Sequence, residues 1–201
     1  MAPRQPRGSY AKGTAKREEI ILSAVEAFGR TGYHATSMRE IAAACNLSQA
    51  GLLHHFPSKE ALLLAIVDYR ENHQGDLSPE TNSGPAVIWP DTYYQQAERN
   101  QEQEALTRLW ANLLGEASDR DHPAHEYFKD RYRSTREAMS QVIAKNNGRE
   151  TPNREDFMKA ALLAAVWDGL QQQWLLDEDF DMMPTFDYAL EMLGRYTKYK
   201  E

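Results

Sequence analysis

The chain has 201 residues, with 23 lysine and arginine side chains against 30 aspartate and glutamate side chains and a formal net charge of −7. This length accommodates one or two domains with a hydrophobic core, and no apolar run approaches the ~18 residues that a membrane-spanning helix needs. The single cysteine, Cys45, excludes a disulfide framework and a cysteine-rich zinc site. The basic N-terminus has no apolar segment behind it and so does not resemble a secretory signal. We therefore expect a cytoplasmic protein without a membrane partner.

The charge is distributed unevenly along the chain. Residues 1–59 hold eight basic and four acidic side chains, whereas residues 60–201 hold 15 and 26. Five of the basic residues fall within residues 1–17, which contain no acid. Such asymmetry suggests an end that faces nucleic acid on an otherwise acidic body. A solubilising tail accounts for the charge equally well.

Helical spacing of apolar residues recurs along the whole chain and strand signals are nearly absent, which predicts an all-α fold. A first apolar stripe runs from Ile20 to Phe28, and Gly32 is a plausible helix stop. Ser37 and Glu40 have the spacing of a capping box, in which each side chain satisfies a free backbone amide, so a second helix is expected to begin there.

Two further short helices are predicted before residue 70. Asn46 interrupts the apolar pattern of the second helix, and Ser48 can cap a further helix that reaches Phe56. Pro57 ends that helix, and Ser58 caps the next one. This helix is apolar on nearly all sides between residues 62 and 69, which indicates cover on several faces.

Glycine and proline crowd residues 74–91, which we interpret as a loop. Beyond it the pattern predicts helices over residues 92–100, 103–118, 123–146, 154–176 and 185–198. Pro123 suits a first helical position, and Asn147 with Gly148 suits a helix end. Asn153 and Asp156 have the spacing of a cap and its third-position acid.

Residues 37–59 carry the strongest functional pattern. Two short helices that are joined by a tight turn at Asn46 and follow a bracing helix describe a helix-turn-helix. The second helix of such a unit enters the major groove with its N-terminal residues, which here are Ser48, Gln49, Ala50 and Gly51. Gln49 can bond a base edge, adenine best, and Lys59 can meet a phosphate. The alternative is a plain helical hairpin with a polar outer face.

The sequence at this point resembles a known family, the tetracycline-repressor-type (TetR/AcrR) transcriptional regulators. The resemblance spans residues 20–66 and is carried by Ile21–Phe28, Gly32–Ala42, Leu47–Phe56 and Lys59–Leu63. It implies a three-helix DNA-binding domain, a linking fourth helix, and a larger helical C-terminal domain that dimerises and holds a ligand. We expect a basic arm over residues 1–17, the helix-turn-helix domain over 18–57, and the ligand-sensing and dimerisation domain over 58–201.

The third helix departs from the family pattern. Ala50 replaces a frequent glycine, and Leu53 and His54 replace frequent tyrosines that tend to touch phosphate; of these two, only His54 keeps a polar ring atom. The DNA contacts that we expect are Thr36, Ser37, Arg39, Ser48, Gln49, Ala50, Gly51, His54, His55 and Lys59, with a flexible arm that contributes Arg4, Arg7, Lys12, Lys16 and Arg17. For His55, packing beside Phe56 is an equal alternative.

Two C-terminal helices are expected to form a homodimer interface, because paired recognition helices must match half-sites about one DNA turn (~34 Å) apart. The residues proposed for it are Ala161, Leu162, Ala165 and Gly169 in the first of these helices and Phe186, Ala189, Leu190 and Leu193 in the second. The family resemblance implies the same four-helix arrangement. The alternative is internal packing of a monomer.

A small-molecule pocket is expected among large side chains on successive helices. The candidate lining residues are Trp110, Phe128, Tyr132, Met139, Trp167, Gln171 and Trp174. Asp168 and residues 171–173 are candidate polar fixtures. Each of these large residues taken singly is more often part of a core than of a binding site.

Residues 119–126 contain several metal-ligand types, namely Asp119, Asp121, His122, His125 and Glu126. No matched second pair of ligands follows, and acids near a helix start are favoured by the helix dipole. We therefore expect no metal site.

Motifs for nucleophilic catalysis, phosphate cradles, dinucleotides and metalloprotease zinc are all missing from the sequence, so we expect no catalytic residues and no cofactor. The predicted function is a ligand-responsive DNA-binding regulator, a repressor that binds a palindromic double-stranded operator as a homodimer and is released by a small molecule. The alternative is a helical small-molecule-binding or interaction protein that does not act on DNA.

Overall fold

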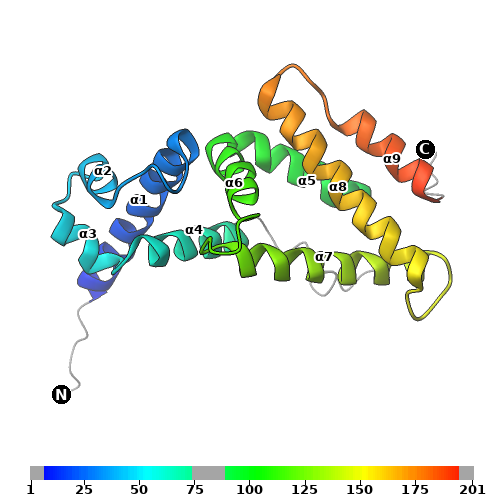
Figure 1. Cartoon of the computed structure of the whole chain (residues 1–201), viewed down its shortest axis with the longest axis horizontal. Helices are drawn as coiled ribbons and strands as arrows, with labels where there is room; N and C mark the ends of the chain where they lie inside the picture. Colours follow the sequence, from blue (N-terminus) through cyan, green and yellow to red (C-terminus); the bar gives the residue numbers. More distant parts are fainter. Residues whose placement is uncertain (1–6, 74–88, 195–201) are drawn as a thin grey trace. The chain divides into compact units, whose positions relative to one another are not determined.

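The computed structural model describes residues 7–73 and 89–194, which form nine α-helices and no strand (Figure 1). The predicted all-α class is therefore confirmed for this part of the chain. The helices are α1 (Arg7–Thr31), α2 (Met38–Ala44), α3 (Gln49–His55), α4 (Lys59–His73), α5 (Trp89–Glu102), α6 (Glu104–Glu116), α7 (His125–Asn146), α8 (Arg154–Leu176) and α9 (Met183–Gly194). None of these nine is both long and apolar enough to cross a membrane.

The predicted helix caps are present at α2, α3 and α4. The Glu40 amide donates to the Ser37 hydroxyl at 3.2 Å, and the Ser37 amide donates to the Glu40 carboxylate at 2.7 Å. Ser48 accepts from the Gly51 amide at 3.0 Å, and Ser58 caps the first turn of α4 at the same distance. Each cap satisfies a backbone donor that the helix start leaves free. Local sequence thus sets where these three helices begin.

Two turns of the first 60 residues require a left-handed backbone. Gly32 has φ +83° and ends α1, as predicted. Asn46 has φ +54° in the turn between α2 and α3, a conformation that asparagine tolerates better than most residues. These two positions turn the chain between the three N-terminal helices.

Several helix bounds differ from the sequence prediction. α1 begins at Arg7, so residues 7–17 are helical and not a flexible arm. α5 begins at Trp89, within the segment expected to be a loop, whose residues 74–88 lie outside the described structure.

α7 begins at His125 and not at Pro123. The Ala124 backbone amide donates a hydrogen bond to Nδ1 of His122 at 3.2 Å, and this bond stabilises the turn that precedes the helix. α9 begins at Met183, whose amide donates to Asp181 at 3.0 Å. The expected end of this last helix, near residue 198, falls outside the described residues.

The chain divides into two compact units, residues 1–73 with 105–124 and residues 74–104 with 125–201. In the first unit α1 packs on α2 and α4, and α2 packs on α3. Its largest fully buried side chains are Ile20, Phe28, Ile41, Leu52, Phe56, Leu62, Leu63, Ile66, Leu109 and Leu113. α6 belongs to this unit, although it follows α4 and α5 in sequence. The domain bounds expected at residues 17 and 57 divide the chain differently and stay predictions.

In the second unit α7 packs on α8, and α9 packs on α8 and α5 (Figure 1). Its core centres on Ala160, Leu163 and Phe186, each at most 1% exposed. The ring of Phe186 lies 4.5 Å from that of Tyr93 and 5.1 Å from that of Trp167. This aromatic cluster joins α5, α8 and α9.

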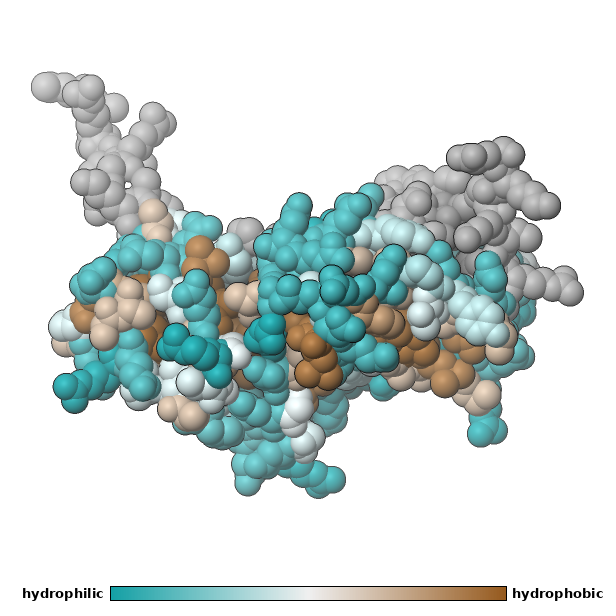
Figure 2. Space-filling model, turned by 90° about the horizontal axis from the view of Figure 1, so that it is seen from above, coloured by the Kyte–Doolittle hydropathy of each residue, from teal (hydrophilic) through white to brown (hydrophobic). Residues whose placement is uncertain are grey.

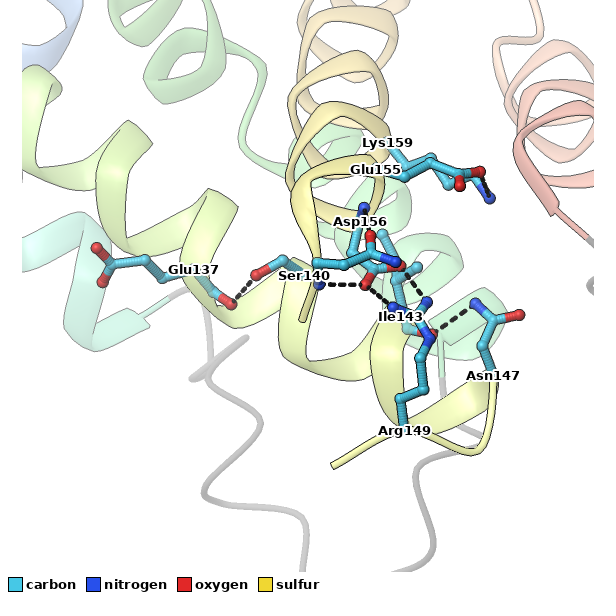
Figure 3. Close-up of polar contacts among 9 residues, drawn as sticks. Glu137, Ser140, Ile143, Asn147, Arg149, Glu155, Asp156 and Lys159 are labelled. Carbon is cyan, nitrogen blue, oxygen red and sulfur yellow. Dashed lines mark hydrogen bonds and ion pairs between the residues drawn. The ribbon is translucent and has the colours of Figure 1, made fainter. Parts of the chain in front are cut away.

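α8 begins at a buried carboxylate. Asn153 and Asp156 form the expected capping box. The Asn153 backbone amide donates to the Asp156 carboxylate at 2.8 Å, and the Asp156 backbone amide donates to the Asn153 side-chain oxygen at 3.1 Å. The guanidinium of Arg149 donates to both Asp156 oxygens at 2.5 and 2.6 Å (Figure 3). This pair holds the pKa of the Asp156 carboxyl below its usual range, with the Asn153 amide adding to the effect. The α7–α8 connection is thereby fixed by a charge-assisted pair.

Candidate nucleic-acid interface

The first turn of α3 is presented to solvent by a buried anchor. Leu52 and Phe56 are fully buried on one side of α3. Gln49 and Ala50 are exposed on its N-terminal turn, and Gly51 is half-buried. The helix therefore offers a polar amide flanked by small residues, on a rigid support. Such a turn fits a DNA groove because the backbone can approach closely.

The end of α3 carries two imidazoles. His54 is exposed and His55 is half-buried, with ring centroids 5.7 Å apart. Leu53, which replaces a frequent family tyrosine, is 39% exposed. His54 can therefore reach outward, whereas the position of His55 accommodates both alternatives that the sequence left open.

Lys16 and Arg17 connect α1 to the ends of the two short helices. The Lys16 ammonium donates to the Cys45 carbonyl at 2.9 Å, where α2 ends. The Arg17 guanidinium donates to the His55 carbonyl at 2.7 Å, where α3 ends, and lies 4.0 Å from the Phe56 ring centroid. Cations are favoured at helix C-termini, where carbonyls are unpaired. These two residues therefore brace the helix-turn-helix, and Arg17 remains exposed.

Lys59 and Thr36 both donate hydrogen bonds to backbone carbonyls of the protein. The Lys59 ammonium donates to the His34 carbonyl at 3.2 Å and lies 4.4 Å from the Tyr33 ring centroid, and burial lowers its pKa. Thr36 is 3% exposed and donates to the Gly32 carbonyl at 2.8 Å. Thr36 therefore closes the loop between α1 and α2 and does not reach the surface.

The other expected contacts are exposed or lie outside the description. Ser37 and Arg39 at the start of α2 are exposed, as is Ser48, although both serine hydroxyls also serve as caps. Arg4 lies outside the described residues. Arg7 and Lys12 lie on α1, but their side chains are not among those described.

Sequence reasoning missed the attachment of α6 to the helix-turn-helix. Both carboxylate oxygens of Glu116 accept from the Tyr33 amide, at 3.1 and 3.2 Å. The Asn112 side chain donates to the Gly29 carbonyl at 3.0 Å. The partners lie 83 residues apart in each case, so no local pattern signals them. These bonds connect a later helix to the loop that precedes α2.

The expected pocket residues are divided between the two units. Trp110 lies in the first unit, buried, with the Arg70 guanidinium 3.9 Å from its ring centroid. The other six lie in the second unit. Phe128, Met139 and Trp174 are buried there, and Trp167 is half-buried.

Polar side chains in the second unit are paired with one another. The Tyr132 hydroxyl donates a hydrogen bond to the Asp168 carboxylate. Burial is the main cause that raises the Tyr132 pKa, and this hydrogen bond raises it further. The side-chain amide of Gln171, which is 5% exposed, accepts from Asn100 at 2.8 Å. Asn100 in turn accepts from Gln96 at 2.7 Å. This buried chain of amides joins α5 to α8.

The α8 residues expected at the dimer interface form an apolar surface. Ala161, Leu162, Ala165 and Gly169 are all exposed, Leu162 at 51%. Met158, one turn earlier, is 53% exposed. Apolar residues, coloured brown, reach the surface at several places on the face shown in Figure 2.

The prediction for α9 selected the wrong face. Phe186 and Leu190 are 0% and 3% exposed and belong to the core, whereas Tyr188 and Met192 are 62% and 68% exposed. Both pairs have the i, i+4 spacing of one helix face, so the sequence did not distinguish them. Ala189 and Leu193, which we also expected at the interface, are half-buried.

These features define a helix-turn-helix domain within an all-helical protein. Residues 20–66 match the model of the family described as bacterial regulatory proteins, tetR family. An uncharacterised helix-turn-helix-type transcriptional regulator of Bacillus subtilis, YuxN, is 44% identical over 54 residues, or 27% of this chain. The match spans 19% of the length of YuxN.

Solved structures resemble nearly the whole chain. NalD, the secondary repressor of the MexAB-OprM multidrug efflux pump in Pseudomonas aeruginosa, aligns with a TM-score of 0.68 at 23% identity, over 91% of this chain and 95% of its own. A complex of triclosan with SmeT, the repressor of a Stenotrophomonas maltophilia multidrug efflux pump, gives 0.68 at 19% identity, over 89% and 90%. At this identity the likeness establishes a shared fold.

Proposed function

We propose that this protein is a ligand-responsive transcriptional regulator that binds a palindromic operator as a homodimer in the cytoplasm and represses transcription. The observation that carries the proposal is the exposed first turn of α3, with Gln49 and Ala50 held on a buried three-helix support. The match of residues 20–66 to the tetR family supports it. The protein acts by binding and uses neither a catalytic residue nor a cofactor.

In this proposal the contacts divide into two groups. Gln49 reads a base edge, and Ser37, Arg39 and His54 contact phosphates or sugars, since all four side chains are exposed. Arg17 can also reach phosphate. Lys16, Thr36 and Lys59 hold the domain together through their internal bonds. Their removal is expected to act through the orientation of α2 and α3.

The exposed apolar face of α8 supports dimerisation. Leu162 and Met158 expose about half of their surface, and Ala165 and Gly169 allow a second helix to approach closely. Burying large apolar side chains stabilises an association. A symmetric pair of chains would also present two copies of α3 to a two-fold site.

We further propose that the effector is a small, largely apolar molecule bound in the second unit. Large aromatic and thioether side chains from α5, α7, α8 and α9 meet there, and few polar groups accompany them. SmeT, which shares the fold, is solved with triclosan. An effector that binds the DNA-free state more tightly would release the operator by shifting the population between two states.

Substitution of one side chain in α3 tests the DNA-binding role. Gln49→Ala is expected to weaken binding to DNA from the flank of the coding region by about 1–3 kcal/mol, because one base contact is lost. Gln101→Ala removes a matched exposed amide from α5 and should leave affinity unchanged. Fluorescence anisotropy at fixed salt gives both values. Equal affinities for the two variants would refute the role of α3.

A further inference from the structure

Three potential metal ligands from separate parts of the sequence meet in the first compact unit. His34 lies in the loop between α1 and α2, Glu116 is the last residue of α6, and His122 lies in the turn that follows. One ligand atom from each lies within 4.8 Å of the others. The sequence pattern of residues 119–126 does not include His34 or Glu116, so it could not indicate this group.

His122 has a buried nitrogen that faces the group. The residue is 3% exposed, and its Nε2 makes no hydrogen bond to any described residue. This nitrogen lies 3.5 Å from a Glu116 carboxylate oxygen. The His122 ring contacts the Tyr33 and His34 rings, with centroids 5.1 and 5.3 Å away.

We propose that His34, Glu116 and His122 bind a divalent transition metal ion of the zinc class. Two imidazoles and one carboxylate form a donor set that suits Zn²⁺ and leave a position for water. Bonds of about 2.0–2.2 Å require the three donors to move closer together than they are here. His34 is exposed, and its ring already lies against that of His122, with centroids 5.3 Å apart.

Two backbone amides beside the site form hydrogen bonds with its ligands. The Tyr33 amide donates to Glu116 and orients its carboxylate, as outer partners of metal ligands do. The His122 Nδ1 accepts from the Ala124 amide at 3.2 Å, so the neutral ring carries its proton on Nε2. Metal binding at Nε2 moves that proton to Nδ1, and the Ala124 hydrogen bond must open. The Ala124 amide therefore reports on occupancy.

A metal at this position would cross-link the last turn of α6 to the loop that leads into α2. The Lys59 ammonium already holds that loop through the His34 carbonyl. Binding to the folded state alone raises thermal stability by mass action. This inference stands apart from the proposed regulator function, because neither the site nor its test involves DNA.

Titration of the full-length, chelator-treated protein tests the site. We expect Zn²⁺ to bind at one ion per chain by calorimetry, Co²⁺ to give the visible absorption of a four-coordinate site, and the Ala124 amide resonance to shift. His34→Ala changes an exposed side chain, so the fold is retained, and should weaken binding at least about tenfold. Glu116→Gln should do the same.

His125→Ala is the matched control, since this neighbouring histidine lies outside the group, and it should retain full affinity. Failure to bind Zn²⁺ or Co²⁺ would overturn the proposal. It would also be overturned by binding that His34→Ala leaves unchanged, because the ion would then sit elsewhere on the surface. The operator experiments are unaffected by either result.

Discussion

Gly32 shows how a single residue determines the entry to the helix-turn-helix. Its φ of +83° is strained for any other residue, and a Cβ there would lie 2.6 Å from a Glu116 oxygen. That oxygen is held by the Tyr33 amide. The turn therefore requires this glycine, and a Cβ would also displace the Glu116 carboxylate from its place beside the loop.

Gly32→Ala is expected to destabilise the protein by about 1–2 kcal/mol, from the left-handed backbone alone. Gly115→Ala is the matched substitution, since its Cβ would meet nothing within 4 Å and its backbone is helical. That change should be neutral or stabilise by about 0.4–1 kcal/mol. Thermal melts of the two variants measure the difference. A melting temperature for Gly32→Ala at or above that of Gly115→Ala would contradict this assignment.

At the residue scale, the sequence predicted α3 and its exposed Gln49, but it did not predict the internal hydrogen bonds of the cations expected to contact DNA. Lys16 and Arg17 bond to carbonyls 29 and 38 residues away. Such partners are set by packing, which charge patterns do not reveal. The same holds for Glu116 and Tyr33.

At the element scale, the start of α8 depends on Asp156. Its carboxylate accepts from the Asn153 amide and from both Arg149 nitrogens while nearly all of its side-chain surface is buried. Asp156→Asn removes the charge and keeps the size, and should lower the stability of the second unit by about 2 kcal/mol. Denaturant melts followed by circular dichroism measure the loss.

The same carboxylate gives a pH dependence of known sign. Because its pKa is lowered on folding, its stabilising contribution is complete above the unfolded value of about 3.9. The contribution is lost as the pH falls through the lower folded value. The stability difference between the native protein and Asp156→Asn should therefore shrink in acid. A difference that stays constant down to the lowest folded pH would contradict this role.

The starts of helices that carry a capping residue were predictable because a cap and its partner are only three residues apart. The capping boxes at Ser37 and Asn153 are both confirmed. The start of α1 was not, since its extension to Arg7 has no cap signal in the sequence. The bonds from Lys16 and Arg17 to the ends of α2 and α3 are likewise tertiary contacts without a local signal.

At the scale of the whole molecule, the apolar face of α8 leads to a prediction about assembly. Leu162→Glu places a charge in the proposed interface and should convert the dimer to monomer, because an unpaired buried charge opposes association. Leu64→Glu is the matched control, with the same 51% exposure on α4, and should stay dimeric. Light scattering after size exclusion gives both masses. A dimeric Leu162→Glu variant would exclude this face.

The molecular organisation was only partly predictable. An all-helical fold with an N-terminal helix-turn-helix follows from periodicity and caps. The division into units does not, because α6 joins the first unit through contacts such as Asn112 with Gly29. The faces of α9 were equally apolar at helical spacing, so only packing against α5 and α8 identified Phe186 as core.

The net negative charge of the chain is consistent with DNA binding because the charge differs between the two parts of the sequence. The first 59 residues have a basic excess and the remainder an acidic one. An acidic body would disfavour non-specific contact with DNA and leave the N-terminal helices to set the orientation. Affinity should accordingly fall as salt is raised.

Footprinting of the native protein on DNA that flanks its own coding region tests the central claim most directly. We predict one protected, two-fold-symmetric site whose half-site centres lie about 34 Å apart along the DNA, with protection weakened by Gln49→Ala. Absence of a protected site across that DNA, or protection without two-fold symmetry, would contradict a dimeric regulator that reads DNA through α3.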